Sequence, residues 1–214
     1  KIQKPATKIK KFLVLYCEKE GVGKSTFQQF LEKLLDKDKV LQTANIAQLF
    51  DDKNAEQKNK LVICLDDIEQ LTRAQSDQLK ARITCNTFGL RAMRRDRIEI
   101  ADYADFVCTT NDPNPCYLSA DNRRFEIIQI NPHYKQGDPI WTRLYEELQS
   151  KQLMAAFFHF FLGFKGVDVS NSRVRVDPEQ LERAKLARMP IVLRCPRPNP
   201  LSAICCPVEG FVPV

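Results

Sequence analysis

The sequence predicts an α/β fold in which a mostly parallel sheet is flanked by helices and followed by a helical C-terminal part. Short, continuous apolar runs alternate with polar and helix-like segments over residues 12–130, and the pattern turns helical from residue 139 to residue 164. Continuous apolar runs bounded by loops are typical of strands buried on both faces, as in a parallel sheet. Strand–helix alternation followed by helices therefore indicates an α/β core with a helical lid.

Local patterns place the elements of the core. Strands are predicted at residues 12–17, 61–65, 104–109 and 125–130. The match of Thr72–Gln75 to a capping box predicts a helix that continues to Ile83. Residues 40–60 are expected to form short helices and loop, and residues 85–103 to be irregular. A helix after the first strand is predicted by apolar residues spaced i, i+3, i+4, i+7 and i+8, namely Phe27, Phe30, Leu31, Leu34 and Leu35.

The chain divides into four predicted segments. Residues 1–11 form a basic lead-in, residues 12–135 the core, residues 136–189 a helical lid or C-terminal subdomain, and residues 190–214 a proline-rich tail or linker. Because the chain starts at Lys1 and shows no signal-peptide pattern, we expect it to be a piece of a longer polypeptide. A stripe at helical spacing is expected to pack within the lid and comprises Leu153, Phe157, Phe160, Phe161 and Phe164.

Composition excludes several classes of protein. Of the 214 residues, 43% are hydrophobic and 28% are charged, which is typical of a globular chain and unlike a disordered one. The longest apolar run, residues 153–164, is shorter than the ~20 residues that cross a membrane, so no membrane association is expected. The eight cysteines include no CxxC pair and only two histidines accompany them, which predicts a reducing, intracellular protein without a zinc site.

A glycine-rich loop, residues 18–26, lies between a predicted buried strand and a predicted helix. Glycines let backbone N–H groups curl around phosphates at a helix N-terminus. Lys24 would reach the β- and γ-phosphates of ATP, and the Ser25 hydroxyl would bind Mg²⁺. The full pattern has its first glycine at the position of Glu18, so the first bend is made without glycine. The predicted ATP-binding residues are Gly21, Val22, Gly23, Lys24, Ser25 and Thr26.

Polar side chains follow two further predicted strands. In ATPases with such a loop, an aspartate at a strand end helps to hold Mg²⁺ and the next acid polarises the attacking water. Asp66 fits the first role and Asp67 the second, with Glu69 as the substitute if the strand ends later. Asn111 can bind the γ-phosphate or orient the water. The alternatives are a solvated strand end for the acids and a simple turn for Asn111.

Two groups of basic residues complete the candidate sites. Arg123 and Arg124 open the last predicted strand, and an arginine inserted into a neighbouring subunit's site stabilises the charge on a transferred phosphoryl group. The alternative is a surface charge pair. Residues 80–97 hold six positive charges against the single Asp96, which suits contacts with DNA phosphates, although a solvated face would look the same. The candidate DNA-binding residues are Lys80, Arg91, Arg94, Arg95 and Arg97.

Five motifs of the sequence, taken in their order, resemble those of superfamily 3 helicases, which are AAA+ ATPases. These motifs are GVGKSTF, LVICLDDIE, LKARIT, FVCTTN and NRRFEI. Such helicases occur in primase-helicases of poxviruses, other large DNA viruses, phages and mobile elements. The resemblance covers residues 12–165 and implies an AAA+ core, a homo-hexameric ring that moves on single-stranded DNA, and a primase domain or other replication proteins as partners. It also implies that Arg91–Arg97 form a pore hairpin, that Asn111 is a sensor, and that Arg123 or Arg124 is an arginine finger.

Two other functions are compatible with the same motifs. A nucleotide-dependent switch or a small-molecule kinase also uses a phosphate-binding loop, but a kinase needs an acceptor pocket and a closing lid with arginines of its own. A weakened ATPase that serves as a DNA-binding scaffold is the other alternative. It is favoured by Glu18, which replaces the usual glycine, and by Asp67, which stands where glutamate is usual.

Overall fold

Five parallel strands form the central sheet of the protein. The structure is a computed structural model that describes residues 1–116, 123–134 and 136–165. Within these residues the strand order is β2-β3-β6-β1-β7, and every pairing in this sheet is parallel. The carboxyl ends of all five strands therefore meet at one edge. The strands are β1 (Phe12–Tyr16), β2 (Val40–Thr43), β3 (Val62–Leu65), β6 (Asp105–Thr110) and β7 (Phe125–Gln129).

The edge strand β2 corrects one expectation from the sequence. Residues 40–60 were expected to hold only short helices and loop, and that is wrong for the first four of them. β2 has two buried residues and pairs with β3 alone. Its apolar pattern is too short to separate a strand from a loop, so the pairing with β3 decides its structure. The rest of the segment does contain the short helix α2 (Ala47–Phe50) and a 3₁₀ turn at Ala55–Gln57.

The predicted helices are confirmed, and their ends follow from local hydrogen bonds. The capping box of α3 is present, since the Thr72 hydroxyl accepts from the Gln75 N–H and the Gln75 side chain accepts from the Thr72 N–H. The helical C-terminal stretch is divided at Ser150, whose hydroxyl accepts from the Leu153 N–H and so begins a new helix. The helices are α1 (Lys24–Leu35), α3 (Arg73–Thr84), α4 (Pro139–Gln149) and α5 (Lys151–Gly163).

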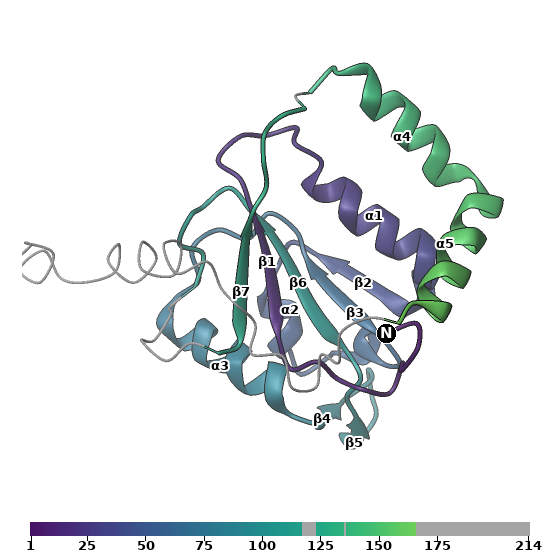
Figure 1. The fold of residues 1–214 in the computed structure, drawn as a ribbon. Coiled ribbons are helices and arrows are strands. Elements are labelled where there is room, and N and C mark those ends of the chain that lie inside the picture. Colours follow the sequence, from purple (N-terminus) through teal and green to yellow (C-terminus); the bar gives the residue numbers. More distant parts are fainter. Residues whose placement is uncertain (117–122, 135, 166–214) are drawn as a thin grey trace, which may run out of the picture.

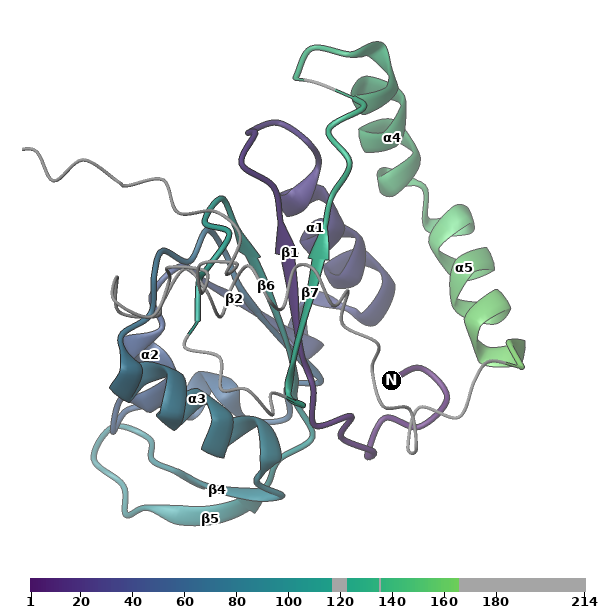
Figure 2. The same ribbon diagram turned by 60° about the vertical axis from the view of Figure 1, so that its left-hand side comes forward.

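An antiparallel hairpin replaces the irregular structure expected over residues 85–103. The strands β4 (Thr87–Leu90) and β5 (Ile98–Ala101) pair through Phe88 with Ile100 and Leu90 with Ile98. The two short strands lie on either side of an arginine-rich turn. Because each strand has only four residues, the sequence alone shows no clear strand pattern here. We call residues 87–101 the basic hairpin. Because it lies just before β6, it is at the amino edge of the sheet, which is the side where the parallel strands begin (Figure 2).

Helices cover both faces of the sheet (Figures 1 and 2). One face packs against α2 and α3 around a large apolar cluster that includes Phe12, Phe106 and Phe125. The other face packs against α1, and α4 and α5 lie outside α1. The buried cysteines of the strands act as core residues, and burial raises the pKa of the Cys64 thiol to about 12.

The expected packing of the aromatic stripe on α5 is confirmed only in part. Phe157 meets Phe30 of α1 edge-on, with ring centroids 5.6 Å apart. By contrast, Phe160 is 59% exposed and Phe164 is 51% exposed to solvent. Residues 166–189 of the predicted lid, together with the proline-rich tail, lie outside the described residues. No helix in the described ranges has the length and apolar character needed to cross a bilayer.

Candidate functional site

The glycine-rich loop joins β1 to α1 at the carboxyl edge of the sheet. Gly21 and Gly23 have positive φ angles of 69° and 86°, a conformation that residues with a side chain rarely adopt. Gly23 is the N-cap of α1, and a glycine has no side chain with which to cap the first-turn N–H groups. Those N–H groups and the positive end of the helix dipole are therefore suited to receive an anion such as a phosphate.

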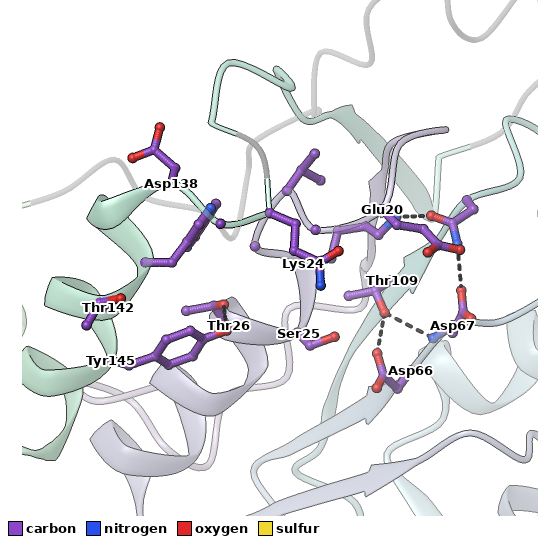
Figure 3. A pocket seen from close by; sticks show the side chains of 17 residues that line it. Glu20, Lys24, Ser25, Thr26, Asp66, Asp67, Thr109, Asp138, Thr142 and Tyr145 are labelled. Carbon is purple, nitrogen blue, oxygen red and sulfur yellow. Dashed lines mark hydrogen bonds between the residues drawn. The ribbon is translucent and has the colours of Figure 1, made fainter.

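A cavity of about 720 Å³ opens over this loop (Figure 3). Four regions distant in the sequence line it: the glycine-rich loop, the end of β3, the end of β6, and α4 with the turn before it. All six predicted ATP-binding residues are among the lining residues. The polar and aromatic residues that the other regions contribute are Asp66, Asp67, Thr109, Asn111, Gln136, Asp138, Trp141, Thr142 and Tyr145.

Lys24, Asn111 and Asp67 form one hydrogen-bonded chain across the cavity. The Lys24 ammonium donates to the Asn111 side-chain oxygen and to the carbonyl oxygens of Cys17, at 2.9 Å, and Lys19, at 3.4 Å. The Asn111 amide in turn donates to Asp67 Oδ1 at 3.2 Å. The fold thus brings three of the residues predicted to be catalytic into contact, although Lys24 and Asn111 are 87 positions apart in the sequence.

Asp66 is held from below by two buried side chains. Thr109 Oγ1 donates to Asp66 Oδ1 at 2.7 Å, and Gln28 Nε2 donates to the same oxygen at 3.2 Å. The parallel register brings the acids and Thr109 together, because Leu65 at the end of β3 lies opposite Cys108 of β6. Neither Thr109 nor Gln28 is among the site residues that the sequence predicts. The one local signal is that Gln28, a polar residue, borders the apolar stripe of α1.

Helix α4 contributes an aromatic side to the cavity that was also missed. The Tyr145 hydroxyl lies 3.1 Å from Thr26 Oγ1, and a Cβ on Gly23 would overlap the ring of Trp141. Gly23 is therefore required by a close approach as well as by its positive φ. Trp141 is the single tryptophan of the chain and lies four residues before Tyr145, so the two share one helix face.

Glu18 and Glu69 lie outside this arrangement. The Glu18 carboxylate accepts a hydrogen bond from the Tyr16 hydroxyl at 2.7 Å, and burial together with this bond raises the pKa of Tyr16 to about 12. Glu18 is turned to Tyr16 and does not line the cavity, and the acid of the loop that does so is Glu20. Glu69 is exposed and is not part of the lining, whereas Asp67 is.

Arg123 and Arg124 lie at the opposite edge of the sheet from the cavity. They precede β7, where the carbonyl oxygen of Arg124 accepts from the N–H of Phe12, the first residue of β1. The cavity is at the other end of these parallel strands. Within one chain the structure therefore does not bring the two arginines to the cavity.

The candidate DNA-binding residues also lie toward the amino edge. Arg91, Arg94, Arg95 and Arg97 all belong to the turn of the basic hairpin and are exposed. Lys80 is separate from them on α3 and pairs with Asp77 at 2.8 Å.

Arg82 departs from the expectation that the whole basic segment is available to phosphates. It is buried, forms an ion pair with Asp102 and lies 3.9 Å from the centre of the Phe88 ring. Lys8 pairs with the same carboxylate. A buried charge requires such partners, so Arg82 holds the base of the basic hairpin against α3.

The donor set of the cavity fits Mg²⁺ that arrives with a phosphate ligand. Mg²⁺ prefers oxygen ligands and is usually held by one or two carboxylates together with substrate phosphates. Ser25 and Asp66 both line the cavity. Among the described residues, no group of three or more His, Cys, Asp or Glu is placed to hold a metal by itself. The oxygens of Ser25 and Asp66 would therefore need phosphate oxygens to complete the coordination.

A match to a known family covers the part of the chain that contributes the glycine-rich loop and the strand ends to this cavity. Residues 15–124 match the model of DUF5906, described as a family of unknown function. The chain belongs to this family. The segment that matches DUF5906 includes the glycine-rich loop, the acids after β3, the basic hairpin and Asn111, but not α4 or α5.

A relative and several solved structures come from a phage. The chain is 25% identical over 166 residues to the DNA primase-polymerase of Nitratiruptor phage NrS-1, a match that spans 75% of this chain and 22% of the relative. Two apo structures of the NrS-1 C-terminal region share its fold, with TM-scores of 0.72 and 0.73 at 21% identity. They cover 89% and 87% of this chain, which spans 47% and 44% of theirs.

Proposed function

We propose that this chain is the ATP-hydrolysing motor part of a DNA replication protein. It is an AAA+ ATPase of the superfamily 3 helicase type that moves on single-stranded DNA as a homo-hexameric ring, with the helical C-terminal part as its lid. The observation that carries the proposal is the cavity that gathers Lys24, Asp66, Asp67 and Asn111 over a helix N-terminus. A replication role is supported by the similarity to a phage DNA primase-polymerase, and a primase domain or other replication proteins are the proposed partners.

The residues of the cavity divide the chemistry between them. The N–H groups of the glycine-rich loop and the Lys24 ammonium bind the phosphates, while Ser25 and Asp66 hold Mg²⁺. When bound, Mg²⁺ neutralises charge on the phosphate oxygens. Because the Asn111 oxygen is the acceptor of Lys24 here, phosphate binding would take its place and leave Asn111 to orient water. Asp67 polarises that water by accepting its hydrogen bond.

The basic hairpin is the proposed contact with DNA. Its turn presents four exposed arginines and the apolar side chain of Met93, which is 69% exposed. Exposed guanidinium groups suit the phosphate backbone, which is the same for every sequence. The hairpin is followed by β6, and Thr109 near the end of β6 and Asn111 just after it line the cavity. DNA contact and hydrolysis are thus assigned to opposite ends of one strand.

The test is ATP hydrolysis by the full 214-residue chain with and without single-stranded DNA. A motor hydrolyses ATP and is stimulated by DNA, a nucleotide switch or kinase is indifferent to DNA, and an inactive scaffold shows no turnover. Lys24→Ala should abolish hydrolysis and weaken ATP binding roughly 10- to 100-fold, because hydrogen bonds to charged groups are worth ~1.5–3 kcal/mol. Lys33→Ala, an exposed lysine on the same helix, is the matched control. Equal rates for the two variants would refute the assigned site.

A further inference from the structure

The carboxylate of Asp66 is held in a hydrogen-bonded frame built from two other elements. Gln28 belongs to α1 and Thr109 to β6, and both side chains are nearly inaccessible to solvent, at 1% exposure each. Gln28 Nε2 lies 3.2 Å from both Asp66 Oδ1 and Thr109 Oγ1. Thr109 Oγ1 lies 2.7 Å from Asp66 Oδ1 (Figure 3). The three side chains therefore form a closed triangle beneath the cavity.

The hydrogen-bonding capacity of the Thr109 hydroxyl is fully used. A hydroxyl offers one donor and two acceptor lone pairs. Its oxygen accepts from Gln28 Nε2 and from the backbone N–H of Asp67 at 3.1 Å. Because both acceptor positions are taken by N–H donors, the hydroxyl proton has to point to Asp66 Oδ1. The orientation of this hydrogen bond is thus determined by its neighbours.

The same threonine also supports the backbone of the second acid. Asp67 has φ +46°, in the left-handed region that residues with a side chain seldom occupy. The Thr109 hydroxyl receives the N–H of Asp67, and the Thr109 carbonyl receives the N–H of Ile68 at 3.0 Å. Hydrogen bonds on both sides of the Asp67 peptide hold that conformation. Thr109 therefore forms hydrogen bonds that hold both acids, at the side chain of Asp66 and at the backbone of Asp67.

We infer that Thr109 and Gln28 are positioning residues, which hold Asp66 so that its second oxygen, Oδ2, is presented to Mg²⁺. Both bonds from the frame fall on Oδ1, which leaves Oδ2 as the oxygen that neither side chain engages. Residues that orient a metal-binding carboxylate typically change metal affinity or activity 10- to 100-fold when they are removed. The inference rests on the proposed function, because it assigns Mg²⁺ to Asp66.

The experiment measures binding of a fluorescent ATP analogue to the full chain, in EDTA and over a series of Mg²⁺ concentrations. Thr109→Val keeps the shape of the side chain but removes the hydroxyl. The Mg²⁺ midpoint is the Mg²⁺ concentration that gives half of the Mg²⁺-dependent gain in nucleotide affinity. We expect Thr109→Val to raise this midpoint about 10-fold, while nucleotide affinity in EDTA is unchanged. Thr109→Ser, which restores the hydroxyl, should recover the wild-type Mg²⁺ midpoint.

Thr110→Val is the matched control for a purely structural effect. Thr110 is the next residue of β6 and is fully buried, and its hydroxyl donates to the Ile68 carbonyl at 2.6 Å rather than to Asp66. Its loss should lower the unfolding temperature without moving the Mg²⁺ midpoint. Should Thr109→Val fail to fold, Gln28→Met provides the same test, because it removes both N–H donors at similar length. Gln29→Met, at an exposed position, is its control.

The outcomes separate this inference from the proposed function. A wild-type chain that binds no nucleotide in either condition would refute the proposed function and the inference with it. The inference alone would be overturned if the wild type binds nucleotide with normal Mg²⁺ dependence and the Mg²⁺ midpoint is unmoved in Thr109→Val or in Gln28→Met. An equal shift in Thr110→Val would also overturn it, because the effect would then follow from lost stability.

Discussion

At the scale of single residues, the ammonium group of Lys24 is engaged by the protein itself. An ammonium has three donors, and Lys24 directs them to the carbonyl oxygens of Cys17 and Lys19 and to the side chain of Asn111. The two carbonyl oxygens hold the charge over the loop, and only the third acceptor comes from another strand. In the proposed function a bound phosphate would replace that third acceptor, so nucleotide binding would release Asn111 from Lys24.

The first prediction concerns Asp67 as the group that polarises water. Asp67→Asn should still bind ATP but hydrolyse it about 10²- to 10⁴-fold more slowly, because an amide is a poor proton acceptor and general bases contribute about that factor. Rapid-quench measurement of phosphate release, beside a nucleotide-binding titration, tests this. Glu69→Gln is the control, since Glu69 lies outside the cavity lining. A normal rate in Asp67→Asn together with a slow rate in Glu69→Gln would transfer the role to Glu69.

At the scale of elements, α4 connects the helical C-terminal part to the glycine-rich loop. Trp141 packs against Gly23, and the Tyr145 hydroxyl meets Thr26 on the first turn of α1. Both contacts fall on the residues that are predicted to bind phosphates. A ligand on the loop must therefore alter the surroundings of α4.

The second prediction uses Trp141 as a reporter of that contact. It is the only tryptophan in the chain and lines the cavity, so its fluorescence should change when Mg²⁺ and ATP bind. Titration with nucleotide under selective excitation of tryptophan measures this. Lys24→Ala should show no change over the same concentrations. An unchanged wild-type signal, at concentrations where a labelled analogue is bound, would contradict the contact between α4 and the ligand.

The third prediction concerns the basic hairpin. Replacing Arg94 and Arg95 together with alanine should weaken binding to single-stranded DNA about equally for every sequence. At a slope of about −0.7 per phosphate contact, the dependence of log K on log salt should become flatter by roughly 1.4. Fluorescence anisotropy with a labelled oligonucleotide at several salt concentrations measures both quantities. Lys37→Ala with Lys39→Ala removes the same charge at another exposed site. An equal loss in that control would indicate an effect of net charge alone.

At the scale of the whole molecule, the two edges of the sheet hold different groups. The carboxyl edge holds the cavity, and the amino edge holds the basic hairpin together with Arg123 and Arg124. An arginine at the amino edge cannot serve the cavity of its own chain without a large rearrangement. If one of these arginines acts on ATP, the cavity must belong to a neighbouring subunit, in agreement with the proposed ring.

The fourth prediction tests this action between subunits. Lys24→Ala chains and Arg123→Ala/Arg124→Ala chains should each be inactive alone. Mixed together, they should recover part of the ATPase rate, because some interfaces then pair an intact glycine-rich loop with intact arginines. ATP hydrolysis is measured across mixing ratios in assemblies shown to exchange subunits. Absence of recovery at every ratio would count against an arginine finger supplied by the neighbouring chain.

Local patterns determined much of the fold in advance. The strands β1 and β3 are continuous apolar runs, and β6 and β7 each contain a shorter apolar stretch. The capping box of α3 and the glycine-rich loop are short motifs whose residues are near neighbours in sequence. Lys24, Asp66, Asp67 and Asn111 could be selected because each follows a recognisable buried strand. The parallel arrangement of those strands then brings their ends to one edge.

Tertiary structure decided the features that depend on distant partners. The strand β2 and the basic hairpin exist through pairing, and the burial of Arg82 depends on Asp102, 20 positions away. Gln28 and Thr109 acquire their roles only because α1 packs on the sheet beside Asp66, and Trp141 only because α4 folds back over the glycine-rich loop. A pattern of neighbouring residues cannot encode such contacts, since their free energy arises when segments far apart in the chain exclude water and share hydrogen bonds.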